Sequence, residues 1–305
     1  MSSTILARGI AKRYGDLLAL DGVSFSAEAG EVLGVLGPNG AGKTTAIRVL
    51  TTILEPTTGT FSVAGVPHGR PEEIRRRIGV LPESAGYPER QTGGEFLRYH
   101  ARLYGRSGRG ARDTAATLLA EVGLGDREDH LIASYSRGMR QRLGIARALV
   151  NDPRVVFLDE PTLGLDPAGQ RQMLAIISRI AGELDATVLL CTHLLDEVEQ
   201  ICTRVLILHR GRVVAHGTVA EVAARAAAPR TATIRFADDD LAAARTALSG
   251  FEVTPAAGGL TVALDGGDSN EALRRLLDAG VSVRAYELGA ARLSDAFLAV
   301  TAGGR

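Results

Sequence analysis

Residues 37–45 carry the clearest chemistry in this sequence. They read GPNGAGKTT and fit the pattern G-x-x-x-x-G-K-[ST], with lysine and threonine at Lys43 and Thr44. Glycines let successive backbone N–H groups point at phosphate oxygens, and a helix that begins near Lys43 adds the positive end of its dipole. The pattern predicts a triphosphate site that also takes Mg²⁺ on the Thr44 hydroxyl. Its predicted members are Gly37, Pro38, Asn39, Gly40, Ala41, Gly42, Lys43, Thr44 and Thr45.

Two acidic residues follow a second apolar run. Residues 155–160 read VVFLDE, which is typical of a buried parallel strand whose carboxyl end faces a ligand. Beside a phosphate loop, Asp159 suits the Mg²⁺ shell, and Glu160 suits the group that orients or deprotonates an attacking water. His193 comes just after another strand pattern, residues 186–193, so we expect it to lie near Lys43 and Glu160.

Two further positions admit two interpretations each. Tyr14 precedes the phosphate loop, where an aromatic ring can stack on adenine; a half-exposed strand tyrosine is the alternative. Ser136 precedes the helical pattern RLGIARALV and suits an N-cap. That helix start can offer amides to an anion, or it can be a plain cap.

The strands and helices expected around these residues fall into three groups. Short strands dominate residues 1–30, with turns expected at 14–16 and near 21–22, and residues 78–83 read as a strand. Residues 84–150 change to helical periodicity, with glycine-rich breaks at 105–110, and look like a helical insertion. Residues 204–217 read as a hairpin that turns at Arg210 and Gly211.

A second domain is expected after a linker at residues 226–230. The pattern from residue 231 onward is βαββαβ followed by a helix, which matches a ferredoxin-like module and carries no evident catalytic set. We therefore expect domains at residues 1–227 and 228–305, a division that 305 residues readily accommodate.

Composition excludes several classes of protein. Apolar residues make up 45% and charges 23% of the chain, with zero net charge, so nothing calls for nucleic acid. Cys191 and Cys202 match no metal spacing and suit the core of a protein in a reducing cytosol. The longest apolar runs are strand-sized, so we expect no membrane span.

Together these motifs resemble the ATP-binding cassette (ABC) family, over roughly residues 4–225. The resemblance implies an α/β P-loop NTPase fold, with a RecA-like mixed sheet, an antiparallel β subdomain and the helical insertion. It also implies an ATPase that uses ATP and Mg²⁺, pairs head to tail with a second copy, and drives a separately encoded transmembrane permease from the cytoplasmic face of the membrane. Beyond the phosphate loop, the residues it implicates are Tyr14 for adenine, Glu83 and Asp159 for the metal, and Glu160 and His193 for catalysis. It also implicates Ser136 and Gly138, in the signature that closes over the other copy's phosphates, and Asp166, a nucleotide-binding residue in the loop after Glu160.

Two departures from the family pattern stand out. The signature is usually close to L-S-G-G-Q, whereas residues 135–139 read YSRGM, so that Arg137 either adds charge there or points to solvent. Glu83 stands where a glutamine is usual. The segment around Glu83 and the C-terminal sequence LSDAFLAVT resemble the drug, antibiotic and sodium efflux branch, which favours an exporter subunit. A cassette that works without a permease, an importer subunit and a non-hydrolysing scaffold are the alternatives.

Overall fold

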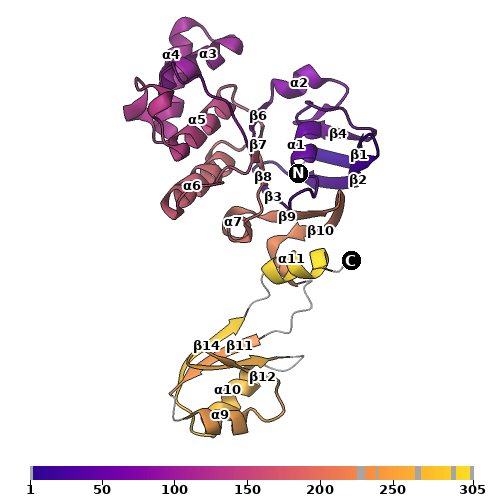
Figure 1. The fold of residues 1–305 in the computed structure, drawn as a ribbon, viewed down its shortest axis with the longest axis vertical. Helices are drawn as coiled ribbons and strands as arrows, with labels where there is room; N and C mark the ends of the chain where they lie inside the picture. Colours follow the sequence, from indigo (N-terminus) through magenta and orange to yellow (C-terminus); the bar gives the residue numbers. More distant parts are fainter. Residues whose placement is uncertain (1–2, 225–230, 238–239, 265–268, 290–292, 303–305) are drawn as a thin grey trace. The chain divides into compact units, whose positions relative to one another are not determined.

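The computed structural model describes residues 3–224, 231–237, 240–264, 269–289 and 293–302. The chain divides into two compact units, Met1–Val219 and Ala220–Arg305 (Figure 1). The predicted linker and the predicted boundary between residues 227 and 228 lie outside the described residues. Among the helices described, none is long and apolar enough to cross a membrane.

A six-stranded sheet forms the centre of the first unit. Its strand order is β10-β9-β3-β8-β7-β6, with β10 antiparallel and the other strands parallel. Every residue of β3, β7 and β8 is buried, as their unbroken apolar runs predict. The strands are β3 (Val32–Leu36), β6 (Ile78–Leu81), β7 (Val155–Asp159), β8 (Thr187–Cys191), β9 (Arg204–His209) and β10 (Arg212–Thr218). The predicted hairpin is confirmed by the pairing of β9 with β10.

A separate antiparallel sheet has the order β2-β1-β4-β5. Its strands are β1 (Ile5–Tyr14), β2 (Leu17–Ala27), β4 (Thr58–Val63) and β5 (Val66–Pro67). The turn expected near residues 21–22 is wrong, because both residues lie inside β2. Gly22 has φ +69° there, and the pairing with β1 shifts register nearby, so the glycine accommodates a bulge in a continuous strand.

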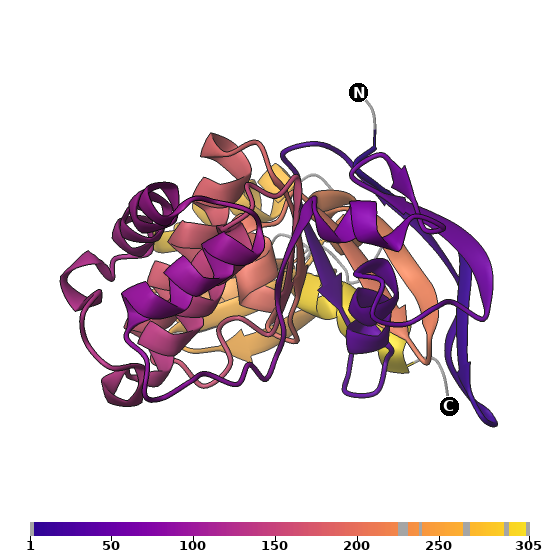
Figure 2. The same ribbon diagram turned by 90° about the horizontal axis from the view of Figure 1, so that it is seen from above.

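Helices cover the central sheet on both sides. Figures 1 and 2 show α3 to α6 on one side of the sheet, and α1 with the antiparallel sheet on the other. The helices of this unit are α1 (Lys43–Leu50), α2 (Pro71–Arg75), α3 (Gly93–Leu103), α4 (Gly108–Glu121), α5 (Arg137–Leu149), α6 (Pro167–Glu183) and α7 (Leu195–Ile201), with 3₁₀ turns at Gly125–Arg127 and Ile132–Ser134 and α8 (Val219–Ala224) at the boundary. The helical insertion is confirmed, since α3, α4 and α5 occupy residues 84–150.

Two element boundaries differ from the expectation. Strand β6 ends at Leu81 rather than at residue 83, because Pro82 has no N–H for the ladder. Helix α4 begins at Gly108, inside the predicted glycine-rich break, since the Ser107 hydroxyl accepts a hydrogen bond from Gly110 N and starts the helix.

The second unit has the predicted order of elements. These are β11 (Thr231–Phe236), α9 (Leu241–Ala247), β12 (Val253–Ala256), β13 (Gly259–Ala263), α10 (Ser269–Asp278), β14 (Val283–Gly289) and α11 (Leu293–Ala302). The strands form one antiparallel sheet in the order β12-β13-β11-β14, as in a ferredoxin-like fold. Its core includes Ile234, Leu248, Leu260 and Leu276.

Candidate functional site

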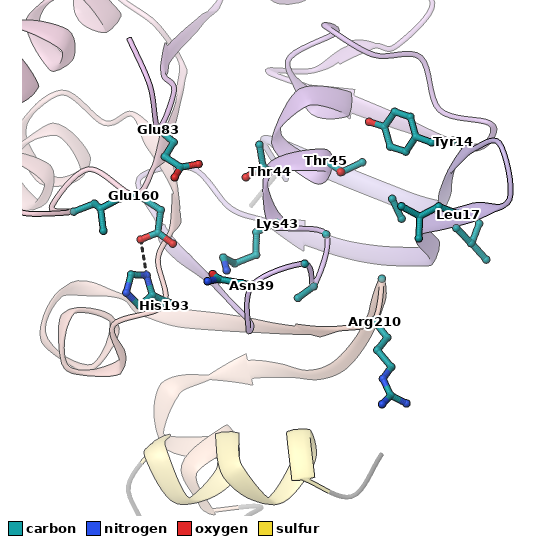
Figure 3. Close-up of a pocket in the computed structure, with 17 residues that line it drawn as sticks. Tyr14, Leu17, Asn39, Lys43, Thr44, Thr45, Glu83, Glu160, His193 and Arg210 are labelled. Atoms are coloured by element: carbon teal, nitrogen blue, oxygen red, sulfur yellow. Dashed lines mark hydrogen bonds and ion pairs between the residues drawn. The ribbon is translucent and has the colours of Figure 1, made fainter. Parts of the chain in front are cut away.

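A pocket of about 850 Å³ lies at the carboxyl ends of the parallel strands. Figure 3 shows the phosphate loop in its middle, Glu83, Glu160 and His193 at one end, and Tyr14 at the other. The predicted site residues that line it are Tyr14, Asn39, Gly40, Ala41, Gly42, Lys43, Thr44, Thr45, Glu83, Glu160 and His193. The structure thus gathers residues from widely separated parts of the chain around one cavity.

The phosphate loop connects β3 to α1 through two glycines that leave no room for a side chain. A Cβ on Gly37 would lie 2.4 Å from Leu208 O, and one on Gly42, whose φ is +106°, would lie 2.7 Å from Ala19 O. Lys43 is only 7% exposed, and its Nζ donates to Gly37 O at 2.7 Å and to Pro38 O at 3.4 Å. The Lys43 ammonium group therefore binds carbonyl oxygens of its own phosphate loop.

Asp159 ends β7 beneath the loop and is 3% exposed. Burial raises the pKa of Asp159; the Thr44 hydroxyl and the Lys43 ammonium oppose this shift, while the carboxylates of Glu83 and Glu160 add to it. Asp159 Oδ1 is buried without a hydrogen-bond partner.

These residues fit a Mg²⁺ site. Magnesium ions in such pockets are usually held by one or two carboxylates together with substrate phosphates, and an orphaned carboxylate oxygen beside a threonine hydroxyl supplies that donor set. No cluster of three or more His, Cys, Asp or Glu side chains that could hold a metal ion occurs among the described residues.

Glu160 and His193 form the second polar pair of the pocket. His193 Nδ1 lies 2.9 Å from Glu160 Oε2, and with Glu160 ionised the Nδ1–H donates to the carboxylate (Figure 3). Glu160 has φ +50°, an unfavourable conformation for a residue with a side chain, and Glu160 N donates to Cys191 O at 2.8 Å. The strained backbone is thus tied to the end of β8, which leads into His193.

Tyr14, the start of β2 and the turn between β9 and β10 form the far end of the pocket. Tyr14 is 41% exposed, and Lys12 Nζ lies 5.5 Å from the centre of its ring. The turn between β9 and β10 closes this end, since Gly211 N donates to Ala41 O at 3.0 Å. Figure 3 shows the Arg210 side chain directed away from the phosphate loop.

Ser136, Gly138 and Asp166 lie in a second pocket, of about 430 Å³, whose lining shares no residue with the first. Ser136 is the N-cap of α5, as predicted: its Oγ accepts from Met139 N at 3.3 Å. Asp166 caps α6 in the same way through Gly169 N. One chain therefore does not bring these three residues to its own phosphate loop.

Arg137 also lines the second pocket, and it is exposed. Its guanidinium lies against Gly164, where an added Cβ would be 2.6 Å from Arg137 Cζ. The Arg137 side chain thus covers the backbone at Gly164, and its positive charge lies at the surface of the second pocket.

Sequence reasoning missed several residues that line the main pocket: Leu17, Leu18, Ala19, Leu163, Arg210 and Gly211. Leu17, Leu18 and Ala19 begin β2, and Leu163 follows Glu160. Arg210 and Gly211 form the β9–β10 turn, which docks against β2 and the phosphate loop through backbone hydrogen bonds. A second omission is Glu197, a buried acid on α7 whose sequence context reads as an ordinary helix surface.

Comparisons with known proteins agree with this geometry. The family model described as ABC transporter matches residues 20–163. The daunorubicin/doxorubicin resistance ATP-binding protein DrrA of Streptomyces peucetius is 38% identical over 306 residues, which cover 96% of this chain and 91% of that protein. The Nod factor export ATP-binding protein I of Burkholderia orbicola (strain AU 1054) is 41% identical over 211 residues, 69% of each chain.

The fold has a solved counterpart, described as an ATP binding subunit of an ABC transporter. It superposes with a TM-score of 0.65 at 32% identity, covering 73% of this chain and 93% of that one. The mixed central sheet, the antiparallel sheet and the helical insertion are therefore those of an ABC cassette. This chain belongs to the ABC transporter family, as an ATP-binding, ATP-hydrolysing subunit of the exporter branch.

Proposed function

We propose that this chain hydrolyses Mg-ATP in the pocket around residues 37–45 and that a separate membrane permease uses the resulting motion for export. The observation that carries the proposal is the pairing of Glu160 with His193, 2.9 Å apart, in the same pocket as the phosphate loop (Figure 3).

The chemistry follows from the groups around that pocket. Lys43 exchanges its loop carbonyls for oxygens of the terminal phosphates, and the loop amides bind the remaining phosphate oxygens. Asp159 and Thr44 would hold Mg²⁺, which when bound neutralises phosphate charge. Glu160 accepts the proton of the attacking water, and His193 holds the carboxylate in orientation through Nδ1. Tyr14 supplies a stacking surface for adenine.

The complete site takes residues from two copies of the chain. Ser136, Gly138 and Asp166 gather in a pocket of their own, where the N-terminus of α5 suits a phosphate. In a head-to-tail pair, this pocket of one copy closes over the phosphates bound by the other. Arg137 adds a positive charge at that surface.

The permease partner would be contacted through the helical insertion. Tyr99, Leu103 and Tyr104 are exposed at the carboxyl-terminal part of α3, downstream of Glu83. Exposed aromatic and apolar residues gathered on one helix suit a protein partner. We propose that the chain binds there to a permease and so resides at the cytoplasmic face of the membrane.

The cargo we propose is a drug, an antibiotic or a similar small molecule, because DrrA is named for daunorubicin and doxorubicin resistance and covers nearly the whole of this chain. The rivals are a cassette that works without a permease and an importer subunit. Co-purification with a membrane protein encoded next to this chain, carrying about six apolar segments of roughly 20 residues, supports transport. Recovery of the chain with ribosomes instead would favour the first rival.

The decisive test is ATP hydrolysis by the purified chain and its Glu160→Gln variant. We expect turnover to fall by a factor of about 10² to 10⁴ while ATP affinity is retained, since the proton acceptor alone is lost. Lys43→Ala should instead lose affinity in a titration with a fluorescent nucleotide. Glu183→Gln, a change at an exposed acid at the end of α6, is the matched control. Equal turnover in Glu160→Gln and wild type would refute the assignment.

A second experiment examines the paired site. Size-exclusion chromatography with light scattering on Glu160→Gln should give a dimer only when Mg-ATP is present. If no dimer forms either alone or in the presence of the permease, two copies do not share the nucleotide.

A further inference from the structure

Glu197 is an unexpected group to find in the interior of this protein. It lies in the first turn of α7 and is 5% exposed, yet no lysine or arginine of the described residues forms an ion pair with it. Burial raises its pKa, the Thr162 and Thr192 hydroxyls oppose the shift, and the charge of Glu160 adds to it. Burying a carboxyl group in such surroundings lowers the free energy of unfolding, so a functional role would explain its presence.

One Glu197 oxygen is connected to the residues on both sides of His193. Thr192 Oγ1 donates to Glu197 Oε2 at 3.0 Å, in a buried hydrogen bond. The same Thr192 Oγ1 accepts from Leu194 N at 3.1 Å. The backbone that carries the His193 ring is therefore held at both ends by a chain of hydrogen bonds that terminates on Glu197.

The Thr162 hydroxyl, on the segment that follows Glu160, lies near Glu197. Thr162 is fully buried, and its hydroxyl acts on the pKa of Glu197. Neither Thr162 Oγ1 nor Glu197 Oε1 has a hydrogen bond of standard geometry, so a donor and an acceptor lie near each other unpaired.

Helix α7 packs closely on the central sheet next to Glu197. It packs on β3 at Gly34, where an added Cβ would lie 2.9 Å from Val198 Cγ1 and 3.0 Å from Cys202 Sγ. Val198 directly follows Glu197 and is fully buried, so Glu197 lies beside the contact of the helix with the sheet.

We propose that Glu197 is a positioning residue: one buried carboxylate that holds the His193 loop through Thr192, and so sets the 2.9 Å pairing of His193 with Glu160. The inference rests on the proposed ATP hydrolysis. Glu197 touches neither nucleotide nor water in this scheme and acts through the geometry of its neighbours.

The test compares Glu197→Met, which keeps the length of the side chain but has no strong hydrogen-bond acceptor, with Glu197→Gln, which retains one. In the full-length protein, Glu197→Met should lower kcat at least about tenfold with less than about a twofold change in the KM for ATP, because a misplaced catalytic pair affects only turnover. Glu197→Gln should recover most of the loss. Thr192→Val, which removes the hydroxyl that links Glu197 to Leu194 N, provides a second variant where Glu197→Met folds poorly. Asp196→Met, at the exposed neighbour on the same helix, is the control and should match wild type.

A readout independent of activity accompanies the kinetics. The imidazole ¹⁵N resonances of His193, identified by their loss in His193→Gln, should move in Glu197→Met and stay in place in Asp196→Met. Unchanged His193 resonances together with a kcat equal to that of the control would overturn the proposal. If wild type and Asp196→Met both fail to hydrolyse ATP, the proposed function fails, while the His193 resonances still decide the role of Glu197.

Discussion

Replacing Asp159 by asparagine should stabilise the nucleotide-free protein while removing its response to Mg²⁺. Asp159 is 3% exposed, its Oδ1 has no partner, and the carboxylates of Glu83 and Glu160 lie near. Leaving such a group unsatisfied costs about 1–3 kcal/mol. Asparagine keeps the shape and removes the charge, so the free energy of unfolding should rise by a similar amount. For a unit of this size, that corresponds to an increase in Tm of roughly 2–12 °C.

Thermal melting followed by circular dichroism separates the two effects. In EDTA, Asp159→Asn should melt above wild type, whereas Asp196→Asn, at an exposed acid, should not. Wild type should gain more stability from Mg-ATP than from ATP in EDTA, because tighter binding to the folded state raises Tm. Asp159→Asn should gain equally from both. A variant that melts below wild type in EDTA, or that still distinguishes Mg-ATP from ATP, would refute the reasoning.

Two further predictions concern other buried groups. Burial raises the pKa of Glu197 above its usual 4.5, so between the unfolded-state and folded-state pKa values the folded chain keeps a proton that the unfolded chain has lost. The free energy of unfolding should therefore fall as pH rises through that interval. Urea denaturation at several pH values should show this fall, and a less steep fall in Glu197→Gln. Tyr135→Phe removes the 2.7 Å hydrogen bond to Arg127 O and should cost about 0.5–1.5 kcal/mol in the same assay, while Tyr104→Phe, at an exposed ring, should cost nothing measurable.

Local patterns predicted much of this structure because local physics determines those parts. The phosphate loop needs glycines at contacts that leave no space for a Cβ, and those glycines are visible in the sequence. Ser136 could be identified as an N-cap because the cap is satisfied within three residues. The buried strands β3, β7 and β8 could be predicted because each is an apolar run in the sequence.

The remainder depends on tertiary packing that no local pattern encodes. Gly22 looked like a turn residue, since positive φ suits turns and bulges alike, and only pairing with β1 decides between them. The hairpin turn at Gly211 was predicted, but its hydrogen bond to Ala41 in the phosphate loop was not. Glu197 was overlooked because acids early in a helix are usually exposed, and its burial follows from the close packing of α7 on Gly34.

The separation of the phosphate-loop pocket from the Ser136 pocket has a genetic consequence under the proposed pairing. A Lys43→Ala copy paired with a Ser136→Ala copy would combine both defects in one site and leave the other site intact. Two alleles that are each inactive when expressed alone should then complement one another when expressed together. Conversely, a copy with both changes should damage each site it joins, so that this allele acts dominantly over wild type.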